Sequence, residues 1–90
     1  MSMDEQYAQM QNFERTLREF NEHLNASMTE LQAQHDNVSP HWQDEMRKNY
    51  DSVWGPFQET MKHYVMSEGP GYVEFLNLKL QALRRYLYGN

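Results

Sequence analysis

The feature that most constrains this chain is a seven-residue repeat of apolar side chains between positions 10 and 31. Side chains seven residues apart lie on one stripe of a helix, so a helix with this repeat packs along a single seam. One set of seam positions holds Met10, Leu17, Leu24 and Leu31, and the other holds Phe13 and Phe20. Glu14 and Arg18 have the i,i+4 spacing of an ion pair beside the seam. The pattern predicts one long amphipathic helix over residues 4–34.

Ser39-Pro40 predicts the start of a second helix, over residues 40–66. Serine is a favoured N-cap and proline is favoured at the first helical position. Apolar and aromatic side chains then recur at helical spacing, at Trp42, Met46, Tyr50, Val53, Trp54 and Phe57. Gly55-Pro56 predicts a kink or break within this helix. Because the connection at residues 35–39 is short, the two helices are expected to be antiparallel neighbours.

Gly69-Pro70-Gly71 is the strongest helix breaker in the chain and predicts a third, short helix over residues 71–88. Its apolar stripe holds Val73, Leu76, Leu80, Leu83 and Leu87. This helix is expected either to fold back on the hairpin or to present its apolar side to another chain. The predicted fold class is therefore all-α, an antiparallel helical hairpin with a short third helix, bundle-like, in a single domain over residues 1–90.

Charge and composition exclude several classes of protein. The formal net charge of −5 argues against nucleic-acid binding, since phosphate neutralisation supplies most non-specific affinity. No stretch approaches the ~18 apolar residues of a membrane span, and the first residues lack the basic and apolar regions of a signal peptide. We therefore expect a cytoplasmic protein without a membrane span. With no cysteine, a disulfide or thiolate metal site is impossible.

No residue pattern predicts catalysis or a cofactor. The serines lie where helix capping or a helix surface explains them, and the acids are spread as surface charges. His35 and His41 flank the predicted turn, but too few ligands accompany them for zinc, so we interpret them as solvated loop residues. The aromatic side chains of the second helix have the spacing of a packed helix face, which we favour over a ligand pocket. We expect a non-enzymatic protein without metal or cofactor.

The segment around the predicted turn resembles the Trp-x-Gly family of small helical-hairpin proteins associated with bacterial type VII secretion. Trp42, Tyr50 and Trp54 match the family spacing, and Asp44 stands where the family has glycine. That family's export signal adds Tyr-x-x-x-Asp/Glu after the second helix, which Tyr64 and Glu68 match. The resemblance implies a small protein that works by pairing, with Trp42, Asp44, Tyr64 and Glu68 as a possible export motif.

These observations predict a helical protein–protein interaction module that forms a homodimer or pairs with another helical protein. The resemblance makes it a type VII secretion substrate, exported without a cleaved signal peptide, or a divergent cytoplasmic relative. The alternative is a small ligand- or metal-responsive subunit, regulatory or accessory, of a larger bacterial complex, using the aromatic side chains with His35 and His41.

Overall fold

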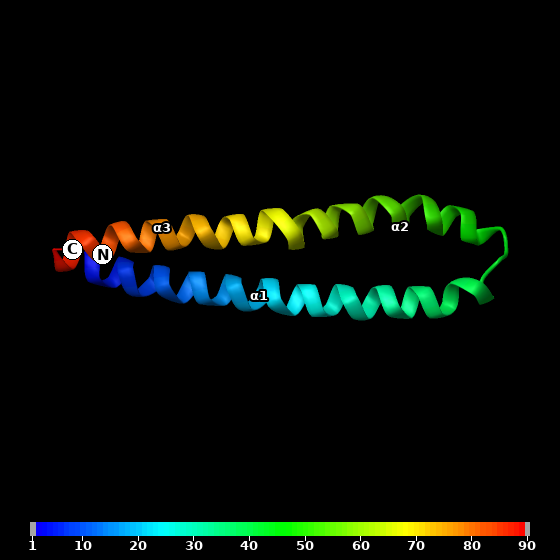
Figure 1. The fold of residues 1–90 in the computed structure, drawn as a ribbon, viewed down its shortest axis with the longest axis horizontal. Helices are drawn as coiled ribbons and strands as arrows, with labels where there is room; N and C mark the ends of the chain where they lie inside the picture. The colour runs from blue at the N-terminus through cyan, green and yellow to red at the C-terminus, as the bar shows by residue number, and fades with distance from the viewer. Residues whose placement is uncertain (1, 90) are drawn as a thin grey trace.

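The computed structural model describes residues 2–89, which form one long helical hairpin of 64 × 21 × 17 Å. The first arm is α1 (Met3–Val38), followed by the short 3₁₀ turn η1 (Ser39–His41). The second arm consists of α2 (Met46–His63), the π-helical turn η2 (Tyr64–Glu68) and α3 (Gly69–Tyr88). Figure 1 shows α2 and α3 end to end beside α1, with the two ends of the chain adjacent. The predicted all-α helical hairpin is confirmed, and the third helix continues the second arm.

Helix α1 runs four residues beyond its predicted end at residue 34. It begins with Ser2, whose hydroxyl oxygen accepts a hydrogen bond from the Glu5 backbone N–H at 3.1 Å. The prediction that residues 35–37 interrupt the helix is wrong. His35 is helical, and the amide of Gln32 donates to the Asp36 carboxylate at 2.9 Å one turn later.

The prediction that the second helix begins at Ser39-Pro40 is also wrong. Those residues form η1, and the α-helix starts only at Met46. The Asp44 carboxylate accepts a hydrogen bond from the Met46 backbone N–H at 3.0 Å and thereby caps the new helix. Helix α2 then runs without interruption through Pro56, so no break occurs at Gly55-Pro56.

The predicted break at Gly69-Pro70-Gly71 is replaced by a wider helical turn. The Gly69 N–H bonds the Tyr64 carbonyl five residues back, which is the π-helical pattern. Proline in an ordinary helix clashes with the carbonyl four residues before it. Because η2 widens the helix just before Pro70, the second arm passes this proline without reversing direction.

The π turn also shifts which residues of α3 face α1. A seven-residue repeat counted from Trp54 and Met61 would reach Glu68, Phe75 and Ala82. The buried residues of α3 lie one position further along the chain, at Gly69, Leu76 and Leu83. One extra residue in η2 therefore turns leucines, rather than aromatic side chains, toward the first arm.

We call the line of contact between the two arms the seam. On α1, the predicted Met10, Leu17 and Leu24 lie in it, half-buried. The other seam position is occupied by Glu14, Asn21, Met28 and His35 instead of Phe13 and Phe20. Among residues 2–89, the buried apolar side chains are Leu76 and Leu83 alone, so one hairpin has a small core.

Polar side chains occupy the middle of the seam. The Tyr64 hydroxyl donates to Asn21 Oδ1 at 2.7 Å, and Gly69 lies directly against both side chains. A β-carbon at Gly69 would stand 3.1 Å from Asn21 and 3.1 Å from the Tyr64 ring, whereas one at Gly71 would meet nothing within 4 Å. The small size of Gly69 is thus what allows the arms to approach at this point.

We expect alanine to have opposite effects at these two glycines. Gly71→Ala should raise the free energy of unfolding by up to about 1 kcal/mol, because alanine favours helix and the site is open. Gly69→Ala should lose that gain, because the Asn21–Tyr64 pair must move to make room for the methyl group. Its free energy of unfolding should be about 1 kcal/mol or more below that of Gly71→Ala. Urea unfolding followed by circular dichroism measures the difference. Equal stability of the two variants would contradict the close contact at Gly69.

Candidate interaction face

Many of the large apolar side chains predicted for an interface or packing seam are exposed in the single hairpin. Phe13 is 56% exposed and Phe20 53%, while Val53 reaches 68%. The remaining predicted seam residues are divided. Tyr50, Trp54, Val73, Leu80 and Leu87 are half-buried between the arms, whereas Leu31, Met46 and Phe57 are exposed.

Most of the exposed apolar residues directly precede a seam residue; Met3, Met66, Leu78 and Tyr88 do not. Phe13 precedes Glu14, and Phe20 precedes Asn21. The same relation holds along both arms for a set that we call the apolar face, namely Phe13, Phe20, Leu31, Val38, Met46, Val53, Phe57, Tyr72, Phe75 and Tyr86. Because one residue of an α-helix turns about 100°, every member is rotated from the seam by the same angle and in the same sense.

These residues point to the same broad side of the hairpin. Two antiparallel helices are related by an approximate two-fold axis perpendicular to their common plane, and that axis leaves each broad side in place. Side chains that are rotated from the seam by the same angle therefore point to the same broad side of the hairpin on both arms. Two ring contacts agree: Phe20 meets Tyr64 across the two arms at 6.4 Å between centroids, and Tyr64 meets Tyr72 along the second arm at 6.3 Å.

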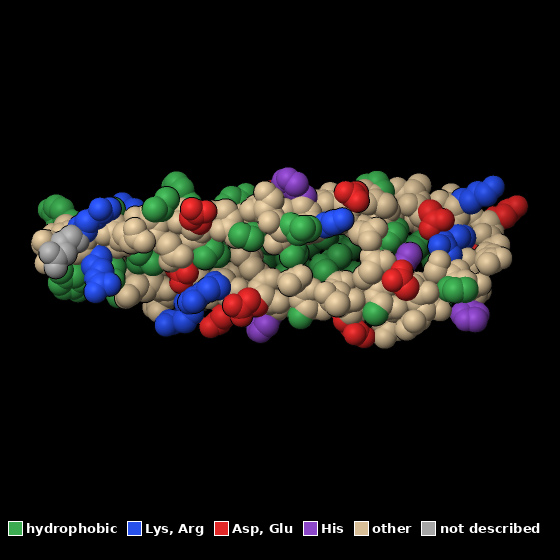
Figure 2. All heavy atoms as spheres, in the orientation of Figure 1, with side chains coloured by type: hydrophobic (Ala, Val, Ile, Leu, Met, Phe, Trp, Pro, Cys, Tyr) green, Lys and Arg blue, Asp and Glu red, His purple; other side chains and the backbone are tan. Residues whose placement is uncertain are grey.

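The apolar face carries few charges. The same helical rotation places Gln9, Thr16, His23, Ser27 and Gln34 beside its α1 residues, and Asn49 and Thr60 beside those of α2. Glu68 and Lys79 are the charged side chains that the rotation brings to this side of the described second arm. Figure 2, in contrast, shows a broad side of the hairpin with acidic and basic side chains spread along both arms. Side-chain polarity thus distinguishes the apolar face from the rest of the surface.

The turn is held by Arg47, whose role the sequence reasoning missed. Its guanidinium donates to the Ser39 and Trp42 carbonyls, each at 2.9 Å, and to the Ser39 hydroxyl at 2.7 Å. It also pairs with Asp51 at 2.7 Å. The Trp42 indole N–H donates to Asp44 at 2.9 Å. The i,i+4 spacing of Arg47 and Asp51 predicts their ion pair from the sequence. The contacts of Arg47 with the two carbonyls, in contrast, form only in the folded turn.

His35 belongs to an aromatic stack beside the turn and is not a solvated loop residue. Its ring lies 4.4 Å from that of Trp54, at 6° between planes, and 5.6 Å from that of Tyr50. Trp42 packs on Tyr50 at 4.7 Å. The matched Trp42, Tyr50 and Trp54 are therefore in contact, and His35 closes the stack from α1.

The other two residues of the possible export motif are both engaged within the chain. Tyr64 binds Asn21 across the seam, and Glu68 lies 2.7 Å from the His63 ring nitrogen. Glu68 and Tyr64 lie at the two ends of η2, about halfway along the second arm. Trp42 and Asp44 lie at the turn, so the motif does not form one local cluster.

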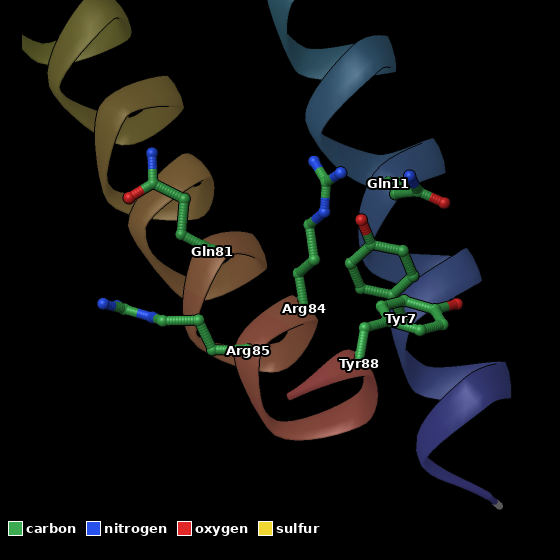
Figure 3. A pocket seen from close by; sticks show the side chains of 6 residues that line it. All are labelled: Tyr7, Gln11, Gln81, Arg84, Arg85 and Tyr88. Atoms are coloured by element: carbon green, nitrogen blue, oxygen red, sulfur yellow. The ribbon is translucent and has the colours of Figure 1, made fainter. Parts of the chain in front are cut away.

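A hollow of about 820 Å³ lies between the ends of the two arms. It is lined by Tyr7, Gln11, Gln81, Arg84, Arg85 and Tyr88. The Tyr7 and Tyr88 rings meet edge to face at 6.2 Å. In Figure 3, Arg84 extends toward α1 while Arg85 points away from it. The two guanidinium groups therefore do not converge on one ligand position.

Neither a cluster of metal-ligating side chains nor a membrane-spanning helix is found in the part of the chain that the structure describes. Within residues 2–89, no three histidine or acidic side chains are grouped closely enough to hold a metal ion. Over the same residues, no helix has the combination of length and hydropathy that crossing a bilayer requires.

Comparisons with protein-family models, with characterised proteins and with solved structures find no match to this chain. The resemblance to the Trp-x-Gly family therefore stays a prediction from the residues at the turn.

Replacing Arg47 should loosen the turn. Arg47→Ala removes the donors of two backbone carbonyls, so we expect a loss of about 1–3 kcal/mol in the free energy of unfolding. Lys48→Ala, at the adjacent exposed position, is the matched control and should stay within about 0.5 kcal/mol of the parent. Chemical denaturation measures both. A loss no larger in Arg47→Ala than in Lys48→Ala would mean that the turn does not depend on these bonds.

Proposed function

We propose that this chain is a non-enzymatic interaction module that pairs with a helical partner through the apolar face. The observation that carries the proposal is the exposure of large aromatic and aliphatic side chains in one register along both arms. Scattered exposed apolar residues are normal, but exposed apolar side chains gathered on one side of a protein mark a candidate binding surface. Here the patch runs from Tyr86, near the chain ends, to Met46 at the turn.

The small core of the hairpin supports the same proposal. Leu76 and Leu83 are its buried apolar side chains within residues 2–89, while Phe13, Phe20 and Phe75 lie largely in solvent. Burying one such side chain fully contributes about 1.5–3 kcal/mol. A partner on the apolar face would therefore add hydrophobic stabilisation that the single hairpin lacks.

A helical partner suits this surface better than an extended peptide. The backbone hydrogen bonds of both arms are made within their own helices, so no open strand edge is offered for β-pairing. Rows of side chains seven residues apart, such as Phe13 with Phe20 and Met46 with Val53, leave hollows that side chains of another helix fill.

The export role implied by the Trp-x-Gly resemblance is a narrower form of this proposal. The helical hairpin and the contacts among Trp42, Tyr50 and Trp54 support it. Against it, Asp44 stands in place of glycine and caps α2, so this turn is built differently from the one the family pattern implies. No contact favours the alternative of a ligand- or metal-responsive subunit.

The proposal predicts that an exposed phenylalanine matters more than its exposure suggests. Phe75 is 71% exposed in the single hairpin, so Phe75→Asp should cost the isolated fold little. If the apolar face is covered by a partner, the aspartate would be buried without a counter-charge and assembly would fail. We expect tagged Phe75→Asp in its natural cells to elute at monomer size or to lose several-fold in abundance.

Leu78→Asp is the matched control. Leu78 is 57% exposed on the same helix and lies two residues after the buried Leu76, a rotation of about 200° that points it directly away from the seam. It should elute with the parent protein on size-exclusion chromatography of the clarified lysate. Identical elution and abundance of both variants and the parent would contradict a partner on the apolar face.

A further inference from the structure

We propose that the broad side of the hairpin opposite the apolar face binds an extended, acidic peptide segment in a groove between the two arms. Carboxamide side chains line the groove over most of its length, and two arginines lie at its end beside the chain termini. This second binding site is separate from the apolar face, so it does not depend on the helical partner proposed above.

The groove consists of four hollows that share lining residues. A hollow of about 210 Å³ and one of about 390 Å³ share Asn25 and Val65. The second of these shares Asn77 with a hollow of about 220 Å³. That hollow in turn shares Arg84 with the 820 Å³ hollow between the chain ends. The four hollows therefore follow one another along the line between the arms.

The groove lies on the side of the hairpin away from the apolar face. Residues of the apolar face directly precede seam residues, whereas residues of the groove directly follow them: Asn25 follows Leu24, and Asn77 follows Leu76. The two rotations of about 100° have opposite senses, so they lead to opposite broad sides. Figure 2 shows the side that carries the groove, hollowed near its middle between the two arms.

Carboxamide side chains line the groove on both arms. Each carboxamide carries donors and an acceptor, as the peptide group does, so a row of them can bind an extended backbone whatever its side chains are. The amides that line the groove include Gln11, Asn25, Gln32, Gln58, Asn77 and Gln81. This lining favours a polypeptide as the occupant.

The π turn leaves two kinds of polar group beside the groove without partners within residues 2–89. Asn21 Nδ2 is buried and has no acceptor, although Asn21 Oδ1 accepts from Tyr64. Pro70 lines the same hollow as Asn21 and has no backbone N–H, so one carbonyl of η2 lacks the donor that a helix would supply. The C=O and N–H groups of an extended segment would provide the missing acceptor and the missing donor.

The length of the groove suits a chain and not a small molecule. It extends along α1 from Tyr7 to Gln32, about 25 residues or roughly 37 Å at ~1.5 Å per residue. An extended peptide advances ~3.3 Å per residue, so about eleven residues would fill the groove.

The groove is basic, although the chain has a net charge of −5. Its charged lining residues are Arg18, Lys62, Arg84 and Arg85 against Glu22 and Glu74. The two acids line the middle hollow, while Asp4 and Glu5, in the first turn of α1, do not line the groove. The excess of positive charge therefore lies at the end beside the chain termini.

Arg84 and Arg85 suit two acidic groups that are spaced along an extended chain. Within residues 2–89, neither arginine forms an ion pair. Their guanidinium groups point in different directions (Figure 3), so they fit successive acidic groups better than one small anion. The expected occupant is a peptide segment with its acidic residues at the end that lies over these arginines.

A displayed library of random peptides about twelve residues long tests the groove. The immobilised full-length protein should enrich peptides whose acidic residues lie toward one end. Synthetic copies of these peptides are then titrated with the protein by fluorescence anisotropy. Arg84→Glu should weaken their binding about ten-fold or more, because a charge-assisted hydrogen bond is lost. Asn25→Leu, at an exposed position between two hollows, should weaken it about three-fold or more.

Lys79→Glu is the matched control for charge. Lys79 lies on the same helix as Arg84 but on the side of the apolar face, so this variant should bind the peptides as the parent protein does. Circular dichroism shows whether the three variants keep the helicity of the parent. Two outcomes would overturn the peptide site, even if the protein bound an oligosaccharide there: no enriched peptide, or peptides that bind Arg84→Glu and Asn25→Leu as tightly as Lys79→Glu.

Discussion

Two helices lying side by side can bury only one narrow stripe each, and every other feature of this hairpin depends on that limit. The chain has more apolar residues at helical spacing than one stripe can hold. The seam takes Leu76 and Leu83 from α3 and Leu17 and Leu24 from α1, and the phenylalanines remain outside. Most of the remaining large apolar side chains lie on one side of the hairpin, and this arrangement makes that side a candidate interface.

Polar side chains in the seam fix how the two arms are aligned along one another. Glu14 is 7% exposed between the arms and pairs with Arg18 at 3.3 Å. Asn21 bonds Tyr64, and Gln32 bonds Gln58 across the seam. The Glu14–Arg18 pair lies within α1, whereas sliding one arm along the other would separate Asn21 from Tyr64 and Gln32 from Gln58. These two pairs across the seam therefore fix which apolar residues face inward and which form the apolar face.

The sequence was sufficient to predict the helical hairpin, but it was insufficient to predict which side of each helix faces the other arm. Seven-residue spacing and a short connection predicted two long antiparallel helices, because those signals are local. The seven-residue spacing assigned Phe13 and Phe20 to an interface or packing seam without distinguishing contacts between the two arms from contacts with another chain. The positions that do face inward, Glu14 and Asn21, belong to a repeat with Met28 that only the packed arms reveal. The role of Arg47 was missed because its partners are backbone carbonyls, which carry no signature in the sequence. The continuous helix through Gly69-Pro70 was missed because a breaker pattern does not distinguish a chain reversal from a wider helical turn.

The π turn means that the spacing of the second arm, as much as its composition, decides what the molecule shows to its surroundings. Leucines and aromatic residues alternate around α3, and the single extra residue in η2 selects the leucines for the inside. A rotation of α3 by about 100° about its own axis would thus turn residues of the apolar face into the seam. An insertion of one residue near Tyr64, with the π turn kept, would turn Phe75 inward in place of Leu76, whereas a deletion of one residue there would remove the π turn and leave the leucines inside. In such a fold, length changes can redirect binding more readily than substitutions can.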